Sequence, residues 1–195
     1  QVRGLAPFVS WIQIDISDGT MEPTKTLTEG KIFTEIVALY PNTSFEAHLM
    51  VDNPAKYLKI LVDAGFKRVI AQVECSDPRA FLDDAALESV EIGLALDGAS
   101  EVEIFEPFLE GLDTAVVMTI EAGTADSPFL PESLEKIKAV HHHFPDLALA
   151  AEGSIDERNG KLLTDAGVTR LVISAETLLK DPTTLSQTLE ALQGK

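Results

Sequence analysis

The stretch Trp11-Ile12-Gln13-Ile14-Asp15-Ile16-Ser17-Asp18-Gly19 is the part of the sequence that decides the fold. Its polar and apolar residues alternate, which predicts a strand with Gln13, Asp15 and Ser17 on one face and three isoleucines on the other. Polar side chains on the inner face of a buried strand are costly unless they have partners. Asp15, close to an Asp-Gly turn, is therefore a candidate reactive group. An edge strand with one face in water is the alternative that this stretch leaves open.

Outward from this stretch, short apolar segments alternate with segments of helical periodicity. Such alternation predicts right-handed βαβ units and a parallel sheet. After the strand at 11–16, we expect strands at 45–50, 68–73, 91–96, 114–119, 147–151 and 170–174. We expect helices within 1–10 and at 31–39, 54–64, 79–87, 101–109, 131–142, 156–166 and 184–192.

Two similar segments indicate a repeating design. Residues 61–70 and 163–172 both contain Asp-Ala-Gly before an apolar run. This pattern predicts the end of a helix, a left-handed glycine cap at Gly65 or Gly167, and then a strand.

About seven strand-helix units fit a (β/α)₈ TIM barrel whose first strand is missing from this chain, since a complete barrel has eight strands and about 200 to 250 residues. We expect a single TIM-barrel domain over residues 1–195. A doubly wound open sheet is the alternative, but no Gly-x-Gly-x-x-Gly turn follows Ile16. The missing strand would leave open edges near Trp11 and Arg170, so we expect a cover there, for which a neighbouring subunit of a homo-oligomer is one candidate.

The chain has 195 residues and a net charge of −17. This charge argues against nucleic acid or an anionic membrane as a partner, because both bind basic surfaces. An anionic substrate would have to be held by local backbone amides and helix N-termini. The single cysteine, Cys75, fits a cytoplasmic location. We find no apolar run of the ~20 residues that a membrane span needs, and no signal peptide.

In a barrel, reactive groups lie at the C-terminal ends of the strands. The polar and sulfur-containing residues at those ends are Gln13, Asp15, Ser17, His48, Met50, Met118, Glu121, Glu152, Ser174 and Glu176. A histidine and several carboxylates converging there could bind a divalent metal or transfer protons. Two simpler interpretations stay open: His48 as a core residue and Glu152 as a helix cap. The run at 141–143 is interpreted as a solvated helix end, because adjacent helical residues point about 100° apart.

Several of these segments together resemble the ribulose-phosphate 3-epimerase family. The first is Asp15-Ile16-Ser17-Asp18-Gly19 with Pro23, which is similar to His-x-Asp-x-Met-Asp-Gly-x-x-x-Pro. The second is Ala47-His48-Leu49-Met50-Val51, which is similar to His-Leu-Met. Residues 118–137 resemble the family's long loop and its next helix, and residues 151–155 resemble Val-Asp-Gly-Gly-Ile. The order and spacing match from Trp11 onward.

The resemblance implies an enzyme that interconverts D-ribulose 5-phosphate and D-xylulose 5-phosphate. By position, Asp15 and Glu152 would be the two carboxylates that transfer the C3 proton. A divalent metal, zinc, iron or manganese, would have Gln13, Asp15, His48 and Glu152 as its ligands. The phosphorylated sugar would contact Gly123, Gly153, Ser154, Ser174, Ala175, Met50 and Met118.

The chain also departs from the family pattern. Gln13 stands where the family has a histidine, and a neutral amide oxygen is a weaker ligand for zinc or iron. Glu152 replaces an aspartate, and Asp126 lies in the segment where the family has its phosphate glycines. Three functions therefore stay open: an epimerase, a catalytically weakened relative that binds a ligand or partner, and another sugar-phosphate isomerase or aldolase.

Overall fold

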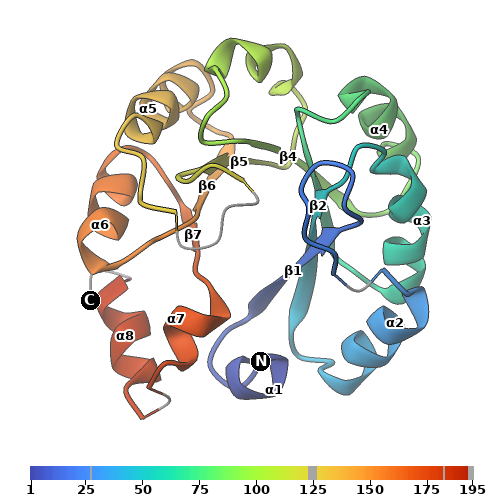
Figure 1. Ribbon diagram of the computed structural model, residues 1–195, viewed down its shortest axis with the longest axis horizontal. Helices are drawn as coiled ribbons and strands as arrows, with labels where there is room; N and C mark the ends of the chain where they lie inside the picture. Colours follow the sequence, from blue (N-terminus) through green and yellow to red (C-terminus); the bar gives the residue numbers. More distant parts are fainter. Residues whose placement is uncertain (27, 123–126, 182, 193–195) are drawn as a thin grey trace.

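The protein folds into one curled sheet of seven parallel strands, which the computed structural model shows with helices around its outside (Figure 1). The structure describes residues 1–26, 28–122, 127–181 and 183–192. The strands pair in chain order, and they are β1 (Trp11–Ser17), β2 (Ser44–Met50), β3 (Arg68–Gln72), β4 (Glu91–Leu96), β5 (Thr114–Met118), β6 (Ala148–Glu152) and β7 (Arg170–Val172). The fold is therefore a (β/α)₈ barrel that lacks one strand, as predicted.

Helices follow the strands in the order expected for βαβ units. They are α1 (Val2–Leu5), α2 (Gly30–Leu39), α3 (Ala55–Ala64), α4 (Pro78–Ala85), α5 (Ser133–His143), α6 (Glu157–Asp165), α7 (Ala175–Leu179) and α8 (Leu185–Leu192). None of these described helices has the length and apolar character that crossing a membrane requires.

The ring of strands stays open between β1 and β7, which are the two edges of the described sheet (Figure 1). This confirms the prediction of open edges near Trp11 and Arg170. The expectation that another subunit covers the gap stays a prediction.

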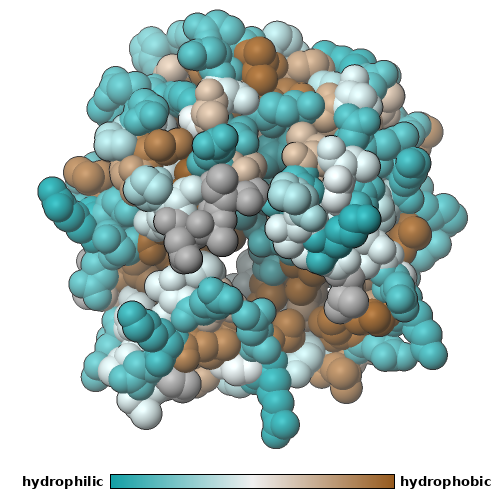
Figure 2. Space-filling model, in the orientation of Figure 1, coloured by the Kyte–Doolittle hydropathy of each residue, from teal (hydrophilic) through white to brown (hydrophobic). Residues whose placement is uncertain are grey.

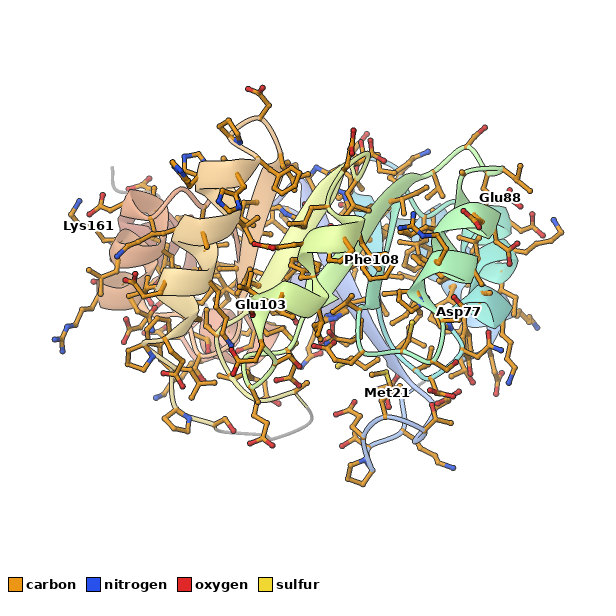
Figure 3. The ribbon with its side chains drawn as sticks, turned by 90° about the horizontal axis from the view of Figure 1, so that it is seen from above. Met21, Asp77, Glu88, Glu103, Phe108 and Lys161 are labelled. Carbon is orange, nitrogen blue, oxygen red and sulfur yellow. The ribbon has the colours of Figure 1, made fainter. Side chains whose placement is uncertain are left out.

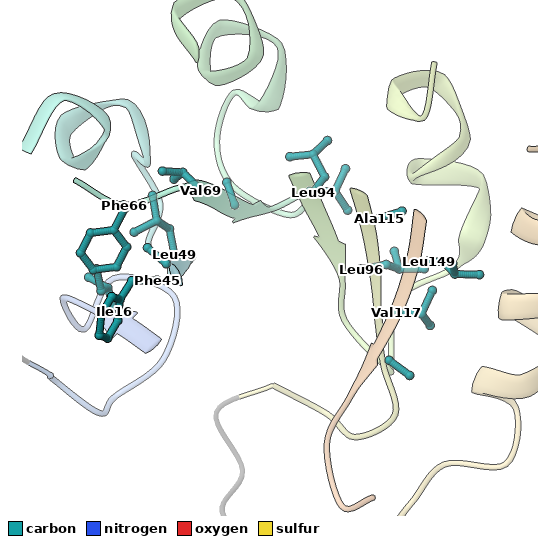
Figure 4. Close-up of a cluster of buried hydrophobic side chains, with 14 of the residues drawn as sticks. Ile16, Phe45, Leu49, Phe66, Val69, Leu94, Leu96, Ala115, Val117 and Leu149 are labelled. Carbon is teal, nitrogen blue, oxygen red and sulfur yellow. The ribbon is translucent and has the colours of Figure 1, made fainter. Parts of the chain in front are cut away.

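The two faces of the sheet have different roles. The outward side chains pack against the helices in the main core, which includes Ile16, Phe45, Leu49, Phe66, Val69, Leu94, Leu96, Ala115, Val117 and Leu149 (Figure 4). The inward side chains form a second, small apolar cluster of Ile70, Ala95, Val116 and Ala150. The isoleucines of β1 belong to or pack against the main core, so its polar residues face inward, as the alternation predicts.

Helix ends follow the local sequence signals. Gly65 and Gly167 have φ angles of 96° and 113°, which confirms the two left-handed caps. Asp156 and Asn159 form a capping box at the start of α6, where each side chain bonds the backbone of the other residue. Glu152 is therefore not the cap of this helix.

The structure differs from the predicted secondary structure in two places. The expected helix at 101–109 is two short 3₁₀ helices, η1 (Val102–Ile104) and η2 (Glu106–Phe108). Pro107 has no N–H for an α-helical bond, which favours the shorter form. The segment after β7 also contains a short helix, α7, that the sequence did not predict; Ser174 caps it by accepting a hydrogen bond from Thr177 N–H.

The loop after β1 extends from the body of the protein at the C-terminal edge of the sheet. In Figure 3, Met21 projects on the same side of the molecule as Asp77, which follows the C-terminal end of β3. Glu88, which precedes β4, lies on the opposite side. Ser17 Oγ donates to Thr24 O at 2.7 Å, and Thr26 Oγ1 donates to Asp15 O at 3.0 Å. The loop therefore folds back onto the end of β1.

Candidate active site

The inward face of β1 brings Gln13 and Asp15 to the C-terminal half of the barrel interior. Gln13 Nε2 donates to Asp15 Oδ1 at 2.8 Å, so the two side chains orient one another. Gln13 Oε1 is buried without a hydrogen-bond partner in the described part of the chain. A buried acceptor of this kind is costly unless a donor or a cation satisfies it.

His48 and Glu152 meet across the interior from β2 and β6. His48 is fully buried, and its Nδ1 lies 3.4 Å from Glu152 Oε1 and 3.1 Å from Glu152 Oε2. The closer oxygen, Oε2, is buried, and its contact with His48 Nδ1 is an ion pair when the imidazole is protonated. His48 is therefore not an inert core histidine, because it faces a carboxylate 104 positions away in sequence.

Asp15, His48 and Glu152 form one cluster. Each contributes one possible ligand atom, and these atoms all lie within 4.8 Å of one another. The pairing register places Asp15 beside His48 on neighbouring strands, so both side chains leave the sheet on the same face. The structure thus brings together Gln13, Asp15, His48 and Glu152, the four residues predicted as metal ligands.

The charges of the cluster perturb one another. Asp15 reaches solvent on one side, yet burial among the protein atoms around it and the Glu152 carboxylate raise its pKa to about 6. Burial alone would lower the pKa of His48, but Glu152 and Asp15 raise it to about 9. Burial would raise the pKa of Glu152, but the His48 imidazolium lowers it below the ordinary value. Two carboxylates in one site thus have pKa values shifted in opposite directions, which is typical of acid–base pairs.

A cavity of about 570 Å³ opens beside this cluster. Asp15 and Glu152 line it together, and no lysine or arginine is among the described residues of its lining. Figure 2 shows a hollow near the middle of the face onto which the C-terminal strand ends open. The volume suits a small organic ligand.

The residues predicted to contact the phosphate lie at this cavity, except for one outside the described residues. Gly153, Ser154, Ser174 and Ala175 all line the cavity, at the ends of β6 and β7. Gly153 and Ser154 have φ angles of 111° and 46°, so the chain turns sharply directly after Glu152. Gly123 lies outside the described residues.

The two methionines predicted to contact the sugar lie away from the lining of the cavity. Met118 is buried beside the Gln72 amide. Met50 lines a smaller space of about 70 Å³, together with Gln72 and Glu74. Their role stays a prediction.

Several residues of the cavity wall were not singled out from the sequence, among them Thr26 and Ile120. Thr26 comes from the loop after β1, and Ile120 follows β5. Nothing in a single sequence shows that a loop folds back over a strand end, so neither residue carried a signal. His141, His142 and His143 end α5, and His143 is paired loosely with Glu106 at 3.6 Å, as expected for a solvated helix end.

Solved structures confirm the barrel fold. The 3-keto-L-gulonate-6-phosphate decarboxylase from Vibrio cholerae aligns with 99% of this chain and 87% of its own, at a TM-score of 0.74 and 15% identity. A 3-hexulose-6-phosphate synthase aligns with 99% of this chain and 90% of its own, at a TM-score of 0.69 and 13% identity. At these identities the likeness concerns the fold alone.

Sequence comparisons are more specific. A ribulose-phosphate 3-epimerase from Schizosaccharomyces pombe is 30% identical over 83% of this chain and 72% of its own length. One from Chlamydia pneumoniae is 29% identical over 95% of this chain and 83% of its own length. The profile of the ribulose-phosphate 3 epimerase family matches residues 5–178. The chain therefore belongs to the ribulose-phosphate 3-epimerase family.

Proposed function

We propose that this protein is an isomerase that interconverts D-ribulose 5-phosphate and D-xylulose 5-phosphate by proton transfer at C3. The observation that carries the proposal is the pair of carboxylates, Asp15 and Glu152, which come from different sides of the barrel interior and face one cavity. Inversion at a carbon needs one group to remove the proton and a second to deliver a proton to the other face. Relatives bearing the epimerase name support the same class of reaction.

Asp15 is suited to exchange a proton near neutral pH, because its pKa of about 6 is close to the working range. In one direction, the Glu152 carboxylate takes the C3 proton while the C3–H electron pair moves toward the C2 carbonyl, whose oxygen becomes negatively charged. The Asp15 carboxyl group, whose raised pKa lets it hold a proton, then returns that proton to the opposite face of C3 as the electron pair moves back. In the reverse direction the two residues exchange these tasks. His48 orients Glu152 through the contact at its Nδ1.

The donor set also fits a divalent metal. Gln13 Oε1 is a buried acceptor with no hydrogen-bond partner among the described residues, which is the state expected of a group that binds a cation. Gln13, Asp15, His48 and Glu152 would hold the ion, and its positive charge would stabilise the negative charge that develops on the substrate oxygens. The oxygen donors suit Mn²⁺ and the imidazole suits Zn²⁺ or Fe²⁺, so this donor set is compatible with each of the three ions.

The phosphate group would lie against Gly153, Ser154, Ser174 and Ala175. These residues present backbone and hydroxyl groups on one stretch of the cavity wall, where β6 and β7 end side by side. Such groups can hydrogen-bond a phosphate without a lysine or arginine. We also propose a cytoplasmic location, which is the compartment named for the rice relative.

Solvent exchange tests the proposed reaction directly. Protein freed of metal and then supplied with Mn²⁺, Zn²⁺ or Fe²⁺ is incubated in D₂O with D-ribulose 5-phosphate. Deuterium uptake at C3 and formation of D-xylulose 5-phosphate are followed by NMR. We expect Asp15→Asn to lower the rate by a factor of about 10² to 10⁴. Asp63→Asn, on the exposed surface of α3, is the matched control and should leave the rate unchanged. No uptake with any of the three metals would overturn the proposal.

A further inference from the structure

The turn that follows β4 is bonded to the neighbouring strand ends through Asp97. Its N–H donates to Glu74 Oε1 at 2.8 Å. Its Oδ1 accepts from Ala99 N–H at 2.8 Å, and its Oδ2 accepts from Ala122 N–H at 3.0 Å. Because each carboxylate oxygen has a backbone donor, this side chain is held in one orientation. Asp97 thus links the segments that follow β3, β4 and β5, through its N–H to Glu74 and through its carboxylate to Ala122.

Gly98 makes a second contact with the same segment. Gly98 N–H donates to Ile120 O at 3.1 Å, and a Cβ atom at this position would collide with that carbonyl group. On its other side, Lys136 Nζ donates to Gly98 O at 2.7 Å and to Ser100 O at 2.6 Å. The turn after β4 therefore holds the segment after β5 at two points, Ile120 O and Ala122 N–H.

This segment forms part of the cavity wall beside the candidate catalytic carboxylate. Ile120 lines the cavity together with Glu152 and Gly153. The approach is close, since a Cβ atom on Gly153 would lie 2.6 Å from Ile120 Cγ1. A shift of Ile120 would therefore change the shape of the cavity next to Glu152. Asp97 itself is not part of the cavity lining.

We propose that Asp97 is a positioning residue, which acts through Ala122 N–H to hold Ile120 in place as a wall of the substrate site. The kinetic consequence rests on the function proposed above. Asp97 does not line the cavity, so its loss should weaken substrate binding more than it slows proton transfer. A change that removes binding shared by the ground state and the transition state raises KM and leaves kcat nearly constant.

Asp113 offers a matched control. It directly precedes β5, at the N-terminal ends of the strands, and its Oδ2 accepts from Ile92 N–H at 2.7 Å. Asp113→Ala removes a carboxylate that bonds the backbone of a neighbouring strand, and Asp97→Ala removes one that bonds the backbone just beyond a neighbouring strand. We expect KM for D-ribulose 5-phosphate to rise about tenfold in Asp97→Ala, with kcat within about twofold of the unmodified protein. Asp113→Ala should change neither constant. Asp97→Asn, which keeps one acceptor oxygen, should restore part of the affinity.

Hydrogen exchange in the substrate-free protein provides a readout that does not depend on activity. Exchange at the Ala122 and Gly98 amides should be faster in Asp97→Ala than in Asp113→Ala. Equal exchange in the two variants, or a fall in kcat with an unchanged KM, would overturn the proposal for Asp97. If the unmodified protein showed no epimerase activity, the proposed function would fail. Faster exchange at Ala122 would then still support the positioning of Ile120 by Asp97.

Discussion

Strand β2 contributes two buried polar residues to the barrel interior, and their surroundings differ in charge. Glu46, toward the N-terminal end, lies between two guanidinium groups, Arg68 on β3 and Arg170 on β7. His48, two residues further along the same face, lies between two carboxylates, Asp15 and Glu152. We refer to Glu46, Arg68 and Arg170 as the floor, and to Asp15, His48 and Glu152 as the mouth.

The floor and the mouth differ in how their buried charges are balanced. At the floor, one carboxylate neutralises charge from two cations, and Glu91 also pairs with Arg68. Within the described chain, one donor of the floor, Arg170 Nη2, has no hydrogen-bond partner. At the mouth, two carboxylates face one imidazole, and the acceptor Gln13 Oε1 beside them has no hydrogen-bond partner among the described residues. The floor thus supplies its own counterions, whereas the mouth has a surplus of acceptors that a proton or a cation could satisfy.

The largest expected effect is at the floor. Glu46→Gln would leave the guanidinium groups of Arg68 and Arg170 without their shared buried counterion, since the Glu46 side chain is 3% exposed. We expect the free energy of unfolding to fall by about 3 to 5 kcal/mol, measured by urea denaturation. Glu91→Gln, at an ion pair whose carboxylate is 47% exposed, should cost less than about 1 kcal/mol. Similar losses in the two variants would show that the floor does not depend on buried pairing.

The mouth should make stability depend on pH. In metal-free protein the pKa of His48 is about 9, above its ordinary 6.5, so protonation favours the folded state. This contribution is complete below about pH 6.5 and is lost as the pH rises through 9. We expect a decrease on the order of 1 to 3 kcal/mol between these values, measured by urea denaturation. In His48→Gln the decrease should disappear. An equal decrease in that variant would assign it to other groups.

The next effect in order of size concerns metal affinity, which we expect to depend on the mouth. Asp15→Asn should lower Mn²⁺ affinity by more than about tenfold, since even indirect partners of metal ligands contribute that much. The same change should leave the stability of the metal-free protein equal or higher at pH 7, because the raised pKa of Asp15 shows that its charge is disfavoured there. Calorimetric titration measures the affinity. Unchanged Mn²⁺ affinity in Asp15→Asn would contradict the proposed ligand set.

The smallest effect concerns the aromatic side of the floor. The guanidinium carbon of Arg68 lies 4.3 Å from the centroid of the Trp11 ring. Trp11→Leu removes this cation–π contact, whose coupling energy should be about 0.5 to 1 kcal/mol. A double-mutant cycle with Arg68→Met measures that coupling by denaturation. A coupling near zero would leave ion pairing as the contribution of Arg68 to the floor.

Much of the fold followed from local signals in the sequence. The positions of all seven described strands were predicted to within about two residues, because short apolar runs rich in β-branched residues are typical of strands that are covered on both faces. The caps at Gly65 and Gly167 were confirmed, since a left-handed residue at a helix end strongly favours glycine. The 3₁₀ helices around Pro107 were missed because apolar spacing alone does not distinguish a short helix from two turns.

The polar cluster of the candidate site could be predicted from the sequence, whereas the contacts among its residues and the rest of the cavity wall could not. Gln13, Asp15, His48 and Glu152 were singled out because the C-terminal ends of parallel strands meet at one edge. The pairing of His48 with Glu152, and the place of Ile120 in the cavity wall, depend on how far the sheet curls. No local pattern encodes that curvature.

The amino-acid sequence by itself determined the alternation of strands and helices, the inward polar face of β1 and the family to which the chain belongs, because these properties depend on residue order and spacing. Only the tertiary structure decided that Glu46 lies among cations and His48 among carboxylates. Electrostatic environment depends on distances across the barrel between residues more than 100 positions apart in the chain. Those distances are set when the sheet curls around its core.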